Sequence, residues 1–190
     1  MSQPRVHLGL PGRLPYAHAH AHQAALRDRA RESGESWLLL LEHDPVFTLG
    51  RAHPEPKLRA AMAVIEAEGI EVVPTERGGD ITYHGPGQLV AYAILRLRDL
   101  GIGPTDLVWM LEECAIATAG EWGIEAGRDG RNRGAWVGDA KLASIGIHVR
   151  GGVSMHGMAL NVRTNLDHFG LIEPCRAARG LDDEHGRPAR

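Results

Sequence analysis

Two cysteines are the candidate nucleophiles of this 190-residue chain, and they lie in different contexts. Cys175 follows Pro174, which fixes its own backbone angle and cannot extend a regular helix or strand, so its thiol is expected on a defined loop. Positive charge from Arg176, or from a lysine brought near by the fold, would favour the nucleophilic thiolate. Cys114 falls on the apolar face of a predicted helix and is expected to be buried and inert. Local sequence leaves Cys175 either a nucleophile or an incidental loop cysteine.

A lysine falls within a predicted strand and is a second candidate for chemistry. Side chains alternate along a strand, so Lys141 is expected on the same apolar face as Ala143, Ile145, Ile147 and Val149. Burial disfavours the ammonium form and lowers a lysine pKa. Lys141 is therefore either an edge lysine whose ammonium reaches water or a tuned catalytic group.

Residues 77–88 form the strongest local signal, because they combine four glycines with an arginine, a tyrosine and a histidine. Gly78 and Gly79 allow a ligand or another strand to approach the backbone, and the turn after His84 is expected to hold that imidazole at a rim. The segment could be only a tight turn. Its content exceeds what a connection needs, which favours a binding loop.

Three histidines, His18, His20 and His22, alternate in a predicted helix. Only His18 and His22 share a helix face, and no third ligand is suggested nearby. A solvated helix face is the favoured interpretation, and we expect no metal site.

Periodicity and breakers predict the elements that must position these residues. Helices are expected over residues 16–33, over residues 56–69 and from Thr105 or Asp106 to Ala119, where Leu107, Met110, Leu111 and Cys114 would line one face. Strands are expected over residues 37–43, 46–49, 70–73, 89–97, 135–137, 141–149 and 153–162. This order predicts a mixed sheet carrying helices, in the α/β or α+β class.

Composition restricts the class of protein. A net charge of -3 and 43% hydrophobic residues suit one globular domain over residues 1–190 without general attraction to nucleic acid or membrane. Residues 1–12 do not look like a secretory signal, and no apolar run is long enough to span a bilayer. A cytoplasmic protein with a flexible tail over residues 180–190 is expected.

Five blocks of sequence together resemble the lipoyl(octanoyl) transferases. They run in order along the chain and are Glu-His-Asp-Pro-Val-Phe-Thr-Leu-Gly-Arg at 42–51, Arg-Gly-Gly-Asp-Ile-Thr-Tyr-His-Gly-Pro-Gly-Gln at 77–88, Lys-Leu-Ala-Ser-Ile-Gly at 141–146, His-Gly-Met-Ala-Leu-Asn at 156–161 and Pro-Cys at 174–175. Each piece could arise elsewhere, but their conjunction is specific.

The resemblance implies the catalytic-domain fold of biotin and lipoate protein ligases. It also implies a ping-pong transfer of octanoyl from acyl carrier protein to a lysine of lipoyl domains, as the first step of endogenous protein lipoylation. The acceptors would be 2-oxoacid dehydrogenase complexes and glycine-cleavage H protein. Cys175 matches the thioester-forming cysteine and Lys141 the lysine beside it. The matched substrate contacts are Arg77, Gly78, Gly79, Asp80, Ile81, Thr82, Tyr83, His84, Ser144, Ile145, Gly146, Gly157, Met158 and Ala159.

The implied enzyme needs no cofactor of its own, because its acyl donor carries phosphopantetheine. Departures from the family pattern lie at the end of the chain, where Arg176 replaces the usual glycine and a polar stretch replaces a terminal helix. Three other interpretations remain: an ATP-using ligase, an octanoyl amidotransferase between lipoyl-bearing proteins, and an inactive module that binds acyl chains or lipoyl domains. The Pro174-Cys175 pair disfavours the ligase, which would not need a nucleophilic cysteine. Arginines at 128, 131 and 133 meet either an acidic carrier protein or solvent.

Overall fold

The computed structural model describes residues 5–52 and 58–173 of the chain. Six strands of this part form one sheet in the order β1-β2-β6-β9-β8-β7, in which β1 and β2 are parallel and the other neighbours are antiparallel. These strands are β1 (Val6–Leu14), β2 (Ser36–His43), β6 (Gln88–Ile94), β7 (Gly134–Val137), β8 (Ala140–Arg150) and β9 (Val153–Asn161).

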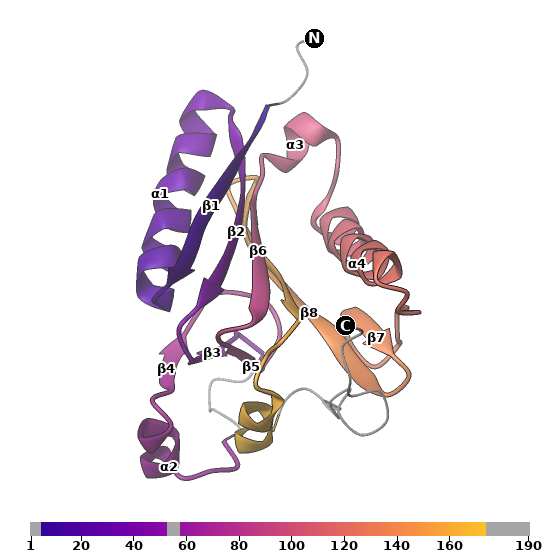
Figure 1. Ribbon diagram of the computed structural model, residues 1–190. Coiled ribbons are helices and arrows are strands. Elements are labelled where there is room, and N and C mark those ends of the chain that lie inside the picture. Colours follow the sequence, from indigo (N-terminus) through magenta and orange to yellow (C-terminus); the bar gives the residue numbers. More distant parts are fainter. Residues whose placement is uncertain (1–4, 53–57, 174–190) are drawn as a thin grey trace.

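Two long helices cover opposite faces of this sheet (Figure 1): α1 (Tyr16–Ser33) and α4 (Pro104–Glu121). The alternation of β6 shows why both faces are apolar. Val90, Tyr92 and Ile94 pack with α1, whereas Ala93 packs with Leu107 of α4. Because both faces of β6 are covered, nearly all of its side chains are buried.

A second sheet of three strands lies at one end of the large sheet, in the order β4-β3-β5. Its members are β3 (Val46–Leu49), β4 (Glu71–Pro74) and β5 (Ile81–His84). Phe47 and Tyr83 from this sheet pack against Ile65 of the short helix α2 (Met62–Ala67) and against Phe169 of the 3-10 helix η1 (Leu166–Leu171). A short helix, α3 (Leu97–Leu100), leads from β6 toward α4.

The predicted mixed sheet with helices is confirmed, and helix α1 has the predicted bounds. Strand β1 was not predicted; its side chains are mostly exposed, so it lacks the apolar signal of a buried strand. Strand β5 lies inside the segment that was expected to be a loop over residues 77–88.

The helix predicted over residues 56–69 is wrong over residues 58–61. Within the described residues it begins only at Met62, because the backbone before it is paired with another segment. Leu58 bridges Ile172, and the N–H groups of Arg59 and Ala60 donate to the carbonyl of Leu171.

Cys114 is exposed, not buried as predicted. Helix α4 begins at Pro104, before the expected cap, and the Asp106 carboxylate accepts a 2.7 Å hydrogen bond from the Gly103 N–H. Its buried face is Leu107, Leu111, Ala115 and Ala119, an i, i+4 row. Cys114 and Met110 lie beside this row, toward solvent.

None of the helices in the described ranges has the length and apolarity needed to cross a membrane.

Candidate active site

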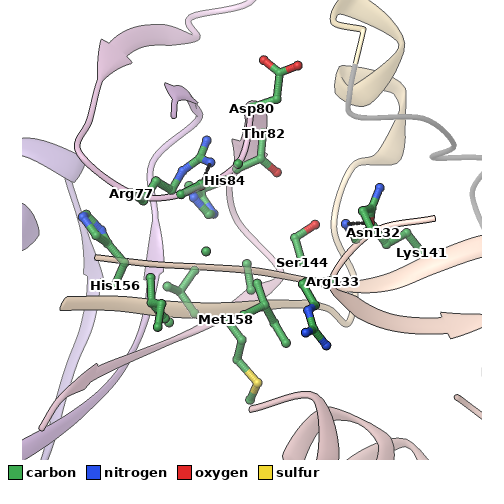
Figure 2. Close-up of a pocket in the computed structure, with 18 of the residues that line it drawn as sticks. Arg77, Asp80, Thr82, His84, Asn132, Arg133, Lys141, Ser144, His156 and Met158 are labelled. Atoms are coloured by element: carbon green, nitrogen blue, oxygen red, sulfur yellow. Dashed lines mark hydrogen bonds between the residues drawn. The ribbon is translucent and has the colours of Figure 1, made fainter. Parts of the chain in front are cut away.

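A cavity of about 480 Å³ lies between the small sheet and strands β8 and β9 of the large sheet (Figure 2). This size falls within the usual range of small-molecule sites, about 300–1,000 Å³. Its lining combines polar residues of the small sheet and the 77–80 loop with apolar residues of the large sheet and of η1. The apolar part includes Val90, Ile145, Ile147, Met158, Ala159 and Phe169.

The loop over residues 77–80 is held against β8 by its backbone. The N–H of Gly78 donates to the carbonyl of Ile147 at 3.0 Å, and the carbonyls of Arg77 and Gly79 accept from Arg51 and Ala52. Gly79 has a φ of 81°, which a residue with a side chain rarely adopts. The glycine pair therefore allows this loop to lie flat on the strand that forms one wall of the cavity.

The guanidinium of Arg77 is buried beneath that loop. Its Nε donates to the hydroxyl of Thr48 at 3.1 Å, its Nη2 to the carbonyl of Thr48 at 2.5 Å, and its Nη1 to the carbonyl of Gly78 at 3.0 Å. The buried positive charge is thus tied to β3. Asp80 is also buried, and its Oδ1 accepts from the Ile81 N–H at 2.8 Å.

His84 begins a chain of hydrogen bonds that crosses the large sheet. Its Nδ1–H donates to Gln88 Oε1 at 2.7 Å, Gln88 Nε2 donates to Asn161 Oδ1 at 2.9 Å, and Asn161 Nδ2 donates to the carbonyl of Lys141 at 3.4 Å. Burial holds the pKa of His84 well below its usual value, so the imidazole is neutral. The chain links the 77–88 segment to the strand that carries Lys141.

Two glycines form part of the cavity floor. Gly146 on β8 and Gly157 on β9 are directly paired, so the floor has no side chain at either position. A Cβ on Gly146 would lie 3.0 Å from the carbonyl oxygen of Gly78, and one on Gly157 would lie 2.1 Å from that of Ala91. Gly157 is required by strand packing, whereas Gly146 is required by the approach of the 77–80 loop.

Lys141 does not share the apolar face of Ile145, Ile147 and Val149, as the sequence predicted. Ala135 pairs with Ala143 but Trp136 pairs with Lys141, so β8 contains one extra residue and its alternation is interrupted. The three apolar side chains pack toward α4, although Ile145 and Ile147 also border the cavity. Lys141 lines the cavity too, where its ammonium donates to Asn132 Oδ1 and lies 5.3 Å from the centre of the Trp136 ring.

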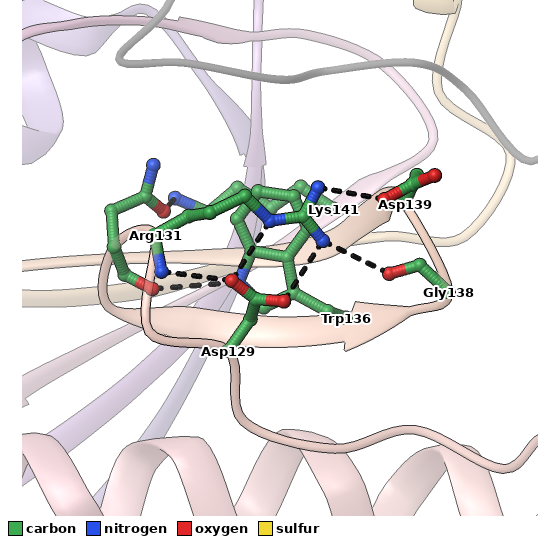
Figure 3. A network of polar contacts seen from close by, with 7 residues as sticks. Asp129, Arg131, Trp136, Gly138, Asp139 and Lys141 are labelled. Atoms are coloured by element: carbon green, nitrogen blue, oxygen red, sulfur yellow. Dashed lines mark hydrogen bonds and ion pairs between the residues drawn. The ribbon is translucent and has the colours of Figure 1, made fainter.

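The indole of Trp136 carries a second cation on its surface (Figure 3). The guanidinium of Arg131 lies 4.3 Å from the ring centre and forms ion pairs with Asp129 at 2.8 Å and Asp139 at 2.9 Å. Arg128 is likewise paired, with Glu112 and Glu113. Arg128 and Arg131 thus have carboxylate partners within the chain, and the more exposed Arg133 lies 3.6 Å from Glu112.

A group of buried rings supports the cavity from the α1 side. Burial lowers the pKa of His43 and raises that of Tyr92 well above its usual value, so His43 is neutral and Tyr92 keeps its proton. Tyr16 and Tyr92 line the cavity, and His43 packs against both. Sequence reasoning missed both tyrosines, although Tyr92 lies in the predicted strand that follows the 77–88 segment.

The cavity collects Lys141 and the expected substrate contacts with one exception. Tyr83 points away into the small-sheet core, where its hydroxyl contacts His168 Nδ1 at 2.8 Å, because neighbouring side chains of β5 face opposite ways. Cys175 lies outside the described residues. His156, Asn132 and Asn161 also line the cavity and were not among the expected contacts. His156 and Asn161 stood within a quoted motif, which was the available signal.

Comparison with known proteins decides the family. The lipoyl protein ligase A/B catalytic domain matches residues 15–182. An octanoyltransferase of Syntrophobacter fumaroxidans is 51% identical over 138 residues, which cover 73% of this chain and 60% of that protein. An octanoyltransferase of Solibacter usitatus is 48% identical over 165 residues, covering 86% of this chain and 75% of that protein. The chain belongs to the octanoyltransferase family.

Solved structures agree on the fold. A protein from T. acidophilum with bound lipoic acid superposes with a TM-score of 0.76 at 18% identity, covering 98% of this chain and 80% of that one. A lipoate-protein ligase A bound with ATP gives a TM-score of 0.67 at 16% identity, covering 98% and 79%. The predicted lipoate-ligase-like fold is therefore confirmed.

Proposed function

We propose that this protein transfers an octanoyl group from octanoyl-acyl carrier protein to a lysine of lipoyl domains through a thioester on Cys175. The observation that supports the proposal most directly is the cavity. This chain belongs to the octanoyltransferase family, and residues from three separate motif blocks line its cavity. The acceptors would be the lipoyl domains of 2-oxoacid dehydrogenase complexes and glycine-cleavage H protein. A cytoplasmic location is part of the proposal.

The lining of the cavity suits an acyl thioester. Its apolar side chains on the large sheet can hold a hydrocarbon chain, while the loop over residues 77–80, Thr82 and Ser144 supply polar atoms for the thioester end. Figure 2 shows Thr82 and Ser144 opposite each other across the cavity. The substrate-contact roles of these residues are inferred from this arrangement.

The last described residues before Cys175 pack beside this cavity. Phe169 lines the cavity, Ile172 is fully buried beside it in the same apolar cluster, and Cys175 follows Ile172 by three residues. Three residues of extended chain span at most about 10 Å. This reach supports the pairing of Cys175 with the cavity that Lys141 lines.

The proposed reaction has two balanced steps. Lys141, once deprotonated to the neutral amine, takes the thiol proton of Cys175. The Cys175 sulfur bonds to the octanoyl carbonyl carbon, the carbon–sulfur bond to phosphopantetheine breaks, and the released thiolate takes the proton back from Lys141. In the second step the acceptor lysine nitrogen bonds to the carbonyl carbon, the bond to Cys175 breaks, and Lys141 relays the amine proton to the sulfur. An amide replaces a thioester, so neither ATP nor a cofactor of the enzyme is needed.

Intact-mass measurement after incubation with octanoyl-acyl carrier protein tests the covalent step. The wild type should gain one octanoyl group, Cys175→Ser should gain none, and Cys114→Ser should behave as the wild type. Because Cys114 is exposed, it is a demanding control for accidental acylation. An adduct that survives Cys175→Ser would overturn the proposal.

The donor is tested separately by offering octanoyl-acyl carrier protein and octanoylated H protein in parallel. Faster adduct formation with the carrier protein supports the proposed donor. Adduct formation from H protein alone would instead identify an amidotransferase, and binding of either donor without an adduct would identify an inactive module.

A further inference from the structure

Helix α1 carries an inward-facing histidine that the proposed transfer does not use. His18 and His22 are exposed, whereas His20 is partly buried and turned toward the loop before Arg77. Its Nε2 lies 3.0 Å from both carboxylate oxygens of Glu76. His20, which does not share the helix face of His18 and His22, is thus the histidine with an acidic neighbour.

A second imidazole faces the same carboxylate. The side chain of His156 on β9 is only 3% exposed, and its Nε2 makes no hydrogen bond. Glu76 Oε1 lies 3.5 Å from this nitrogen. A buried ring nitrogen that makes no hydrogen bond is free to accept a further ligand.

The spacing of these three groups matches a coordination sphere. One ligand atom from each of His20, Glu76 and His156 lies within 4.8 Å of the other two, and two of the separations are 3.0 and 3.5 Å. Zinc bonds of about 2.0–2.2 Å in tetrahedral geometry place ligand atoms roughly 3.3–3.5 Å apart. Small side-chain movements would bring all three atoms to this separation.

The charges also suit a cation. Glu76 offers a carboxylate oxygen, and His20 and His156 each offer a ring nitrogen. Two neutral imidazoles and one carboxylate are a common donor set for zinc. Glu76 and His20 are about one-third exposed, which leaves an entry path from solvent.

We propose that His20, Glu76 and His156 form a binding site for a divalent transition-metal ion such as Zn²⁺. The ion would join helix α1, the segment that precedes the 77–80 loop, and strand β9. Since His156 also lines the cavity, the ion would fix one wall of the cavity relative to that loop. The three protein ligands leave a fourth tetrahedral position for water or another ligand.

Titration of the metal-free full-length protein with Co²⁺, followed by visible absorption, and with Zn²⁺, followed by calorimetry, tests this site. We expect one ion per chain. His20→Ala and Glu76→Gln should each weaken binding by at least about tenfold, whereas His18→Ala and His22→Ala on the same helix should leave it unchanged. Zn²⁺ should also raise the Tm of the wild type and of His18→Ala but not that of His20→Ala.

The ligands can be separated from the thiols by their spectrum. A Cys114→Ser/Cys175→Ser double variant should bind Co²⁺ as the wild type does, without sulfur-to-metal charge transfer in either protein. Absence of stoichiometric binding, equal loss in His18→Ala and His20→Ala, or loss in the double cysteine variant would each overturn the site. The measurement needs no acyl donor, so it stands apart from the proposed transfer reaction.

Discussion

The hydroxyl of Tyr92 donates a 2.6 Å hydrogen bond to Nε2 of His43, and the Nδ1–H of His43 donates to the carbonyl of Leu14 at 2.9 Å. Both ring nitrogens of a fully buried histidine are thereby satisfied, and its tautomer is fixed. The pair lies directly behind the cavity that Tyr92 lines.

Tyr92→Phe should lower the free energy of unfolding by about 1–3 kcal/mol, because it leaves Nε2 of His43 buried without a partner. Chemical denaturation measures this. Tyr83→Phe is the matched control: its hydroxyl partner, His168, is 14% exposed and can turn to water, so the loss should be smaller. Equal losses in the two variants would contradict the account of the His43 pair.

Stability should decrease as the pH falls below about 6.5. Burial is the main cause, and the neighbouring His43 a smaller one, of a His84 pKa well below its value in the unfolded chain. Below pH 6.5 the unfolded chain therefore binds a proton at His84 that the folded protein does not bind. The contribution of neutral His84 to the free energy of unfolding is fully present above pH 6.5. It decreases as the pH falls toward the pKa of His84 in the folded protein, by up to about 1.4 kcal/mol per pH unit. Denaturation of the wild type and of His84→Gln between pH 8 and about pH 5 checks this. A slope unchanged in His84→Gln would count against it.

Lys141→Ala should slow alkylation of Cys175 near neutral pH and shift its pH profile upward, since the proposed role of the lysine is to favour the thiolate. The experiment uses a Cys114→Ser background, because Cys114 is exposed and would also react. Arg150→Ala, at the exposed end of the same strand, is the control for a general loss of positive charge. An identical profile in Lys141→Ala and the parent would remove the lysine from the mechanism.

Gly146→Ala should reduce octanoyl adduct formation mainly through a higher KM. The new Cβ would lie 3.0 Å from the Gly78 carbonyl oxygen and would push the 77–80 loop from β8. Gly127→Ala is the control, because its Cβ would meet no atom within 4 Å. Steady-state kinetics with octanoyl-acyl carrier protein separates KM from kcat, and unchanged constants in Gly146→Ala would show that the loop position is irrelevant.

Sequence patterns predicted the elements that are buried on at least one face. Strands β2, β3 and β6 carry clear apolar runs, and helix α1 is bounded by Pro15 and Gly34, so their predicted and observed bounds agree within a few residues. Strand β1 escaped prediction because it is an edge strand whose side chains are mostly exposed. The exposure of Cys114 was not predicted because the buried face of α4 is narrow. Leu107 and Leu111 lie on that face, whereas the side chain of Cys114 lies beside it.

The site was harder to predict because its parts meet only through tertiary contacts. The 77–84 segment, β8 and β9 could each be singled out locally, yet only the bulge in β8 brings Lys141 to the cavity. The contact of His20 with Glu76 joins residues 56 positions apart in the chain. No spacing rule for a helix could suggest it, since such rules compare residues on the same element.

Helix α1 has an inner face that serves two purposes. Ala19, Leu26 and Ala30 pack on the large sheet, while Tyr16 lines the cavity and the side-chain oxygen of Gln23 accepts the backbone N–H of His156 at 2.8 Å. Tolerance to substitution should therefore follow a helical period along α1. In a mutational scan, substitutions on this face of α1 would reduce activity whether they destabilise the fold or alter the cavity. Measuring protein abundance in parallel would distinguish these two causes.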